Sequence, residues 1–243
     1  MKKIYYITAV FATLFLVGCG DGIDLPGVNV ETDLNKIPLP DNNVNLEQVE
    51  LKPSTEPMLH EGLHTEEDFQ RIRDKKAAGE EPWVSAYQLL VESQFSQKTA
   101  DTYPTEWIKR GVSGDENYMN AARGATIVYQ QALRWKIEQD DEYAAKAVEN
   151  LNKWVQTCVG VTGNTNLSLA AGLYGYEFAI AGELLRDYGG WDRADFAAFQ
   201  NWLLKVFYPA NDDFLKRHHD TNALHYWANW CLCNIAAKMA IGI

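Results

Sequence analysis

The sequence predicts an all-α protein over residues 58–243, and three observations indicate this fold class. Apolar residues recur at three- and four-residue spacing in successive segments, which is the period of an amphipathic helix. Helix-start and helix-stop residues stand at the ends of the first of these segments. Hairpin signals between alternating strands do not occur in this part of the sequence.

The expected helices follow one another closely. The first starts after Thr65, a good N-cap residue whose reciprocal partner is Asp68, and it ends at Gly79. Pro82 stands just inside the second, at the position where proline is favoured. Further periodic segments occupy residues 117–139, 141–158, 167–189, 193–209 and 220–243. Short polar turns between successive helices predict antiparallel helical hairpins.

The N-terminus has the layout of an export signal. Residues 1–18 place two lysines before an apolar run that is short for a membrane span. The run ends in "LVGC", which resembles a bacterial lipobox and implies lipidation of Cys19. Residues 19–57 are rich in proline, asparagine and acids without periodicity, so we expect a flexible linker. The chain is therefore expected in the periplasm or on the outer membrane, held by a lipid anchor.

The charge balance excludes one class of partner. The 243 residues carry a net charge of −11, and removing Lys2 and Lys3 with the signal makes it −13. Such an acidic chain lacks the surface excess of lysine and arginine that binding to nucleic-acid phosphates requires, so we expect no nucleic-acid partner. A local basic patch at residues 216–219 can still meet an acidic substrate. Cys158, Cys231 and Cys233 are too few for a disulfide framework and are expected as free thiols.

The stretch "RHHDTNALHYWANWCLCN" holds histidines and asparagines among tryptophans and alanines. On one continuous helix, at about 100° per residue, five groups share a side: Asn222, His225, Tyr226, Asn229 and Cys233. Buried amides and imidazoles cost free energy unless they are hydrogen-bonded. We therefore expect this stripe to face a cleft and meet a ligand, the alternative being a satisfied structural network.

Three segments resemble the alginate-lyase-like polysaccharide lyases. They are "HEGLHTEEDFQRIRDKKAAGEEPWVSAYQLL", "YGYEFAIAGELLRDYGGW" and "NWCLCNIAAKMAIGI", so the resemblance covers roughly residues 58–243. It implies an (α/α) toroid of helical hairpins around a cleft, here incomplete, because the family domain extends beyond residue 243. The apolar ending "KMAIGI" also leads us to expect a C-terminally truncated fragment.

The resemblance further implies β-elimination on a uronate-containing polymer such as alginate or glucuronan. This chemistry needs donors that neutralise the uronate carboxylate, and a base and acid for which a tyrosine serves. Asn222 and His225 are the expected catalytic pair, although "NALHYW" departs from the family's "NNH-YW" pattern. The expected substrate contacts are Arg123, Tyr176, Tyr226, Asn229 and Trp230. No metal or other cofactor is expected, and the catalytic tyrosine is not identified.

Other interpretations remain open from the residues alone. His225 could be structural, Trp230 could be a core residue, and Arg123 could pair with an acid. A glycoside hydrolase on the same fold would need two opposed carboxylates, for which Glu177 and Glu183 are available. A non-catalytic glycan-binding lipoprotein would keep the aromatic residues without a base. The cluster of His218, His219, His225, Cys231 and Cys233 matches no familiar zinc spacing. The sequence does not indicate the oligomeric state.

Overall fold

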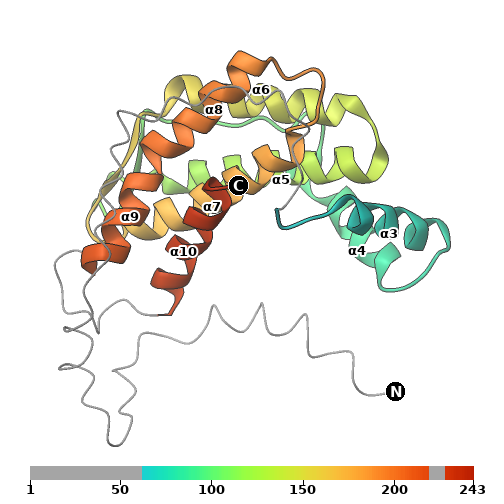
Figure 1. Cartoon of the computed structure of the whole chain (residues 1–243), viewed down its shortest axis with the longest axis horizontal. Coiled ribbons are helices and arrows are strands. Elements are labelled where there is room, and N and C mark those ends of the chain that lie inside the picture. The colour runs from blue at the N-terminus through green and yellow to red at the C-terminus, as the bar shows by residue number, and fades with distance from the viewer. Residues whose placement is uncertain (1–61, 219–227) are drawn as a thin grey trace, which may run out of the picture. The chain divides into compact units, whose positions relative to one another are not determined.

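The computed structural model describes residues 62–218 and 228–243, and it confirms the all-α class (Figure 1). All of the described elements belong to one compact unit, residues 39–243. The α-helices are α3 Glu66–Ala77, α4 Trp83–Glu92, α5 Tyr118–Glu138, α6 Asp141–Thr157, α7 Leu167–Leu185, α8 Arg193–Val206, α9 Tyr208–Arg217 and α10 Asn229–Ile241, and a 3-10 turn, η2, spans Gln94–Ser96. A toroid arrangement stays a prediction.

The first helix begins as its sequence predicts. The Thr65 hydroxyl accepts a hydrogen bond from the backbone N–H of Asp68 at 3.2 Å, and the Asp68 carboxylate accepts one from the Thr65 N–H at 3.0 Å. These bonds satisfy N–H groups that have no partner inside the helix. Pro82 directly precedes α4, one residue earlier than expected.

Helices α5, α7 and α10 lie side by side, with α7 in contact with both of the others (Figure 1). Helix α6 packs on α5, and a two-residue connection joins them as a helical hairpin. Aromatic rings fill the space where α6, α7 and α8 meet: Phe178 lies 5.4 Å from Trp154 and 5.2 Å from Trp202 between ring centroids. Such tilted and edge-on pairs are favourable arrangements in a core.

The structure also differs from the expected elements elsewhere, and the expected helix 167–189 ends at Leu185. A parallel pair of strands, β1 Trp107–Arg110 and β2 Gly160–Gly163, stands where no strand was expected. The expected helix 193–209 ends at Val206, and α9 follows it directly. The expected helix 220–243 is also wrong at its start, because α10 begins at Asn229 and Ala228 has a φ of 64°, outside right-handed helical geometry.

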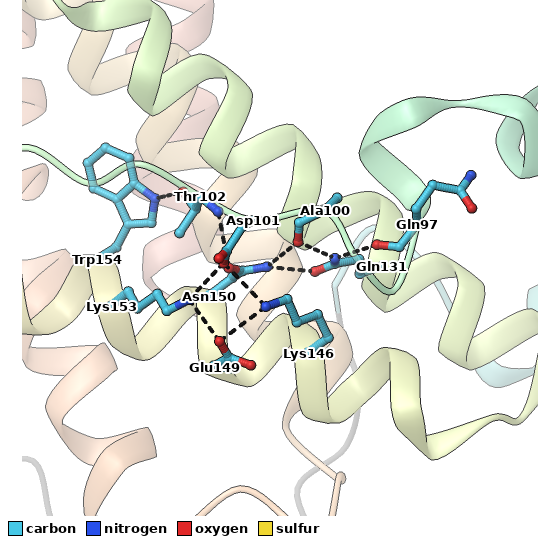
Figure 2. Close-up of polar contacts among 10 residues, drawn as sticks. All are labelled: Gln97, Ala100, Asp101, Thr102, Gln131, Lys146, Glu149, Asn150, Lys153 and Trp154. Carbon is cyan, nitrogen blue, oxygen red and sulfur yellow. Dashed lines mark hydrogen bonds and ion pairs between the residues drawn. The ribbon is translucent and has the colours of Figure 1, made fainter.

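A buried polar network holds the connection 97–102 against α5 and α6 (Figure 2). The Gln131 amide donates to the carbonyls of Gln97 and Ala100, at 2.9 and 3.1 Å. Asn150 donates to Ala100 and to Gln131, and its oxygen accepts from the N–H of Thr102 at 3.2 Å. Gln131 and Asn150 are both fully buried, so these bonds remove the cost of placing amides in the core.

Candidate active site

A seam between α5 and α7 gathers half-buried polar side chains. Helix α5 contributes Thr126 and Tyr129, and helix α7 contributes Tyr176 and Glu177. The two helices are in contact along this side, and Glu177 is close enough to both tyrosines to influence their pKa values. The seam therefore combines hydroxyl, phenol and carboxyl groups that are neither sealed in the core nor fully solvated.

His64 reaches the seam from the segment before α3. Its Nε2 atom and the Tyr129 hydroxyl are hydrogen-bonded at 2.8 Å, and the two rings stack with centroids 6.1 Å apart. Burial lowers the pKa of His64, while the charges of Asp68 and Glu183 act in the opposite direction. Burial raises the pKa of Tyr129 to about 12, and Tyr176 and Glu177 add to this. Near neutral pH these shifts favour an uncharged phenol beside an uncharged imidazole, a pair that can share and pass a proton.

Glu177 can change its protonation state near neutral pH. Burial raises the pKa of its carboxyl to about 7, and the Thr126 side chain acts in the opposite direction. A carboxyl in this range can donate a hydrogen bond when protonated and accept a proton when ionised. From the sequence, Glu177 was expected only as a hydrolase carboxylate, and His64 and Tyr129 were not expected at the site. The "GLH" before the capping box was the available signal for His64.

The hydrolase interpretation needs a second carboxylate in the cleft, and Glu183 does not supply it. Only 4% of Glu183 is exposed. The segment before α3 lies against it, so that a Cβ at Gly62 would be 2.8 Å from the Glu183 carboxyl carbon. An inverting or retaining hydrolase requires two carboxyl groups that both reach the substrate. Glu177 and Glu183 do not form such a pair.

Two predicted substrate contacts lie on α5 and α7. Tyr176 is half-buried beside Glu177 on the seam, and burial raises its pKa. Arg123 is exposed, one helical turn before Thr126 on α5. Within the described residues Arg123 has no ion pair, contrary to the alternative that it meets an acid. Tyr176 is therefore partly accessible to solvent, and Arg123 is more accessible.

The other predicted contacts lie on α10 or outside the described residues. Asn229 is the exposed first residue of α10. Trp230 is buried, packed with Leu169 and Phe214, so its surroundings are those of a core residue. Asn222, His225 and Tyr226 lie outside the described residues, as does Cys19. The stripe that was expected to join these groups to Asn229 and Cys233 assumed one continuous helix, and the backbone at Ala228 interrupts it.

The described residues contain no candidate metal site, and their cysteines carry free thiols. Among the residues that the structure describes, no group of three His, Cys, Asp or Glu side chains could hold a metal ion. Cys158, Cys231 and Cys233 are free thiols, as expected. The Cys231 sulfur lies 3.4 Å from Nε2 of His218. No helix in the described ranges is long and apolar enough to cross a membrane.

An all-helical fold with a seam of proton-exchanging side chains is compatible with acid–base chemistry on a polar substrate. The chain belongs to the alginate lyase family, whose model matches residues 72–240, well over half of its length. No curated protein and no solved structure matches the chain. Membership places the protein among the polysaccharide lyases and implies an acidic polysaccharide as substrate.

Proposed function

We propose that the protein cleaves a uronate-containing polymer, alginate or glucuronan, by β-elimination. The observation that supports this best is the family match over residues 72–240. Elimination removes the proton at C5 of the uronate and expels the oxygen at C4. That proton becomes acidic enough only when the adjacent carboxylate is neutralised by donors, which is electrostatic stabilisation of the developing enolate.

The proposed roles follow from this chemistry. Asn222 and His225 donate hydrogen bonds to the carboxylate, and a tyrosine acts as base and then as acid. Tyr176, Arg123, Tyr226 and Asn229 are the proposed substrate contacts, whereas Trp230, also expected from the sequence, is buried in the core. The seam of Tyr129, His64 and Glu177 supports the proposal, because its groups exchange protons and lie beside Tyr176.

Incubation of the protein with alginate and with glucuronan tests the reaction. β-Elimination leaves an unsaturated uronate that absorbs ultraviolet light, so we expect absorbance to rise together with new reducing ends. Reducing ends without absorbance would instead establish a hydrolase. Binding without either product would establish a glycan-binding protein, and both of these results contradict the proposal.

The role of His225 has its own test. His225→Ala should lower turnover by about 100-fold or more, a loss typical of an essential transition-state donor, with little change in the free energy of unfolding. His218 is the matched control, because its ring packs 4.9 Å from that of Phe214 at the end of α9. His218→Ala should lower stability more than turnover. A larger loss of stability than of turnover in His225→Ala would show that His225 is structural.

We also propose export and a lipid anchor at Cys19, from the lipobox-like "LVGC". Thiol lipidation would hold the protein in the periplasm or at the outer membrane. In a bacterial host that processes lipoproteins, the chain should fractionate with membranes, and Cys19→Ala should move it to the soluble fraction. A wild-type chain already in the soluble fraction would contradict the anchor.

A further inference from the structure

We infer that Arg110 binds the carboxylate of a uronate unit, at a subsite formed by Arg110 and Tyr118. This inference rests on the proposed function, because it identifies how the same polymer is held. Arg110 is the last residue of β1 and pairs with Gly163 of β2. That backbone is tightly constrained, since a Cβ on Gly163 would be 1.8 Å from the Arg110 carbonyl oxygen.

The Arg110 side chain packs against an aromatic residue of α5. Its guanidinium carbon lies 4.8 Å from the centre of the Tyr118 ring at the start of α5, a cation–π contact. On α7, burial raises the pKa of Tyr174 to about 12, and the charge of Arg110 acts in the opposite direction. Cys233 of α10 is also within the influence of this charge. Strand β1 contacts both α5 and α7, so Arg110 stands at the end of a strand that lies against these two helices.

Arg110 lacks the acceptor that a partly buried guanidinium normally has. Its Nη1 atom is buried and has no hydrogen-bond partner, and no carboxylate in the described residues forms an ion pair with it. The neighbouring Lys109 pairs with Asp115 at 2.6 Å, and the buried Arg134 pairs with Glu138. An unmet charged donor in a buried position is costly, so its presence needs an explanation. A ligand that brings its own acceptor provides one.

The chemistry of the surroundings indicates which ligand that is. A guanidinium presents a planar fork of N–H groups that matches the two oxygens of a carboxylate. The partly exposed Tyr118 ring offers an apolar face to a sugar ring. On α7, Glu177 lies close enough to Tyr174 to influence its pKa. Burial raises the pKa of Glu177 itself to about 7, so near neutral pH a large fraction of this carboxyl is protonated and does not repel an incoming carboxylate. A sugar acid fits these features, because its carboxylate can accept a hydrogen bond from the Arg110 guanidinium. A neutral sugar has no carboxylate to do so.

Binding of the full chain to sodium alginate and to glucuronan tests the subsite, with dextran as a neutral polymer. The wild type should bind at least one of the two acidic polymers. For that polymer, Arg110→Ala should raise the dissociation constant on the order of 10- to 100-fold, which is the range for losing a charge-assisted hydrogen bond. Arg110→Lys should recover part of this loss, because lysine keeps the positive charge but cannot form the two parallel hydrogen bonds of a guanidinium to a carboxylate. Arg193→Ala is the matched control, an exposed arginine at the start of α8 that should leave binding unchanged.

The outcomes separate this inference from the proposed function. Ultraviolet absorbance of the products reports on elimination, and the binding constants report on Arg110. Weakened binding in Arg110→Ala without elimination by the wild type would support the subsite and refute the lyase. Two results would overturn the subsite while leaving the lyase intact, provided that the wild type catalyses elimination. One is that folded Arg110→Ala binds the polymer as tightly as the wild type, and the other is that Arg193→Ala weakens binding as much as Arg110→Ala does. Failure of the wild type to bind either acidic polymer would overturn both.

Discussion

At the scale of single residues, the environment of Glu177 is the feature with the clearest chemical consequence. Glutamate is ordinarily ionised above its reference pKa of 4.5, but the side chain here is half-buried between α5 and α7. Desolvation penalises the charged form and favours the proton. Among the described residues, the Thr126 side chain counteracts this effect on the carboxyl. Glu177 therefore binds its proton more tightly in the folded protein than in the unfolded chain.

This difference makes folding stability depend on pH in a known direction. Between pH 4.5 and about 7 the folded state keeps a proton that the unfolded state has lost, so the contribution of Glu177 to stability falls as pH rises. Glu177→Gln removes the titration. The variant should gain stability relative to wild type across this window, by up to about 3 kcal/mol. Urea unfolding at several pH values measures this.

Other carboxylates titrate in the same window, so a control is needed. Glu67→Gln removes an exposed glutamate from α3 and should leave the wild-type pH profile nearly unchanged. A difference between wild type and Glu177→Gln that stays constant from pH 4.5 to pH 7 would show that the Glu177 pKa is not raised by folding.

At the scale of elements, the contact between α7 and α10 depends on a small residue. A Cβ on Gly172 would be 2.6 Å from the Cys233 sulfur and 3.0 Å from its carbonyl carbon. Distances this short leave no room for a side chain, so glycine lets the two helices approach closely. The approach places Cys233 and Asn234 of α10 directly against α7, which is the partner that α10 contacts most extensively.

The helices could be predicted from the sequence, because their apolar spacing and caps are local properties. The break at Ala228 could not, since no glycine or proline marks it and helical periodicity continues through it. The strands were missed because four residues are too few to show an alternating pattern. Of the candidate site, the sequence indicated Tyr176, which lies on the seam. His64 and Tyr129 meet through a hydrogen bond between distant segments, and Arg110 meets Tyr118 through a separate contact, so neither pair is visible in local sequence patterns.

At the scale of the whole molecule, buried amides connect parts of the chain that are far apart in sequence. Residues 97–102 link α4 and η2 to β1 and α5 without regular secondary structure of their own. Their backbone groups are satisfied by Gln131 of α5 and Asn150 of α6 (Figure 2). Lys146 and Lys153 of α6 add ion pairs to Asp101 at the surface. Because exposed ion pairs contribute little, the buried amides should account for most of the attachment.

Asn150→Ala tests this attachment. The change removes three hydrogen bonds at a fully buried position and leaves the Thr102 N–H, the Ala100 carbonyl and the Gln131 amide short of partners. We expect a loss of about 2–4 kcal/mol in the free energy of unfolding, with faster amide exchange at Thr102. Asn152→Ala is the control on the same helix, because Asn152 bonds to Asp195 at the surface and should contribute less than about 0.5 kcal/mol. Equal losses of unfolding free energy in Asn150→Ala and Asn152→Ala would mean that the buried hydrogen bonds do not hold residues 97–102 in place. Packing of α5 on α6 would then account for the attachment.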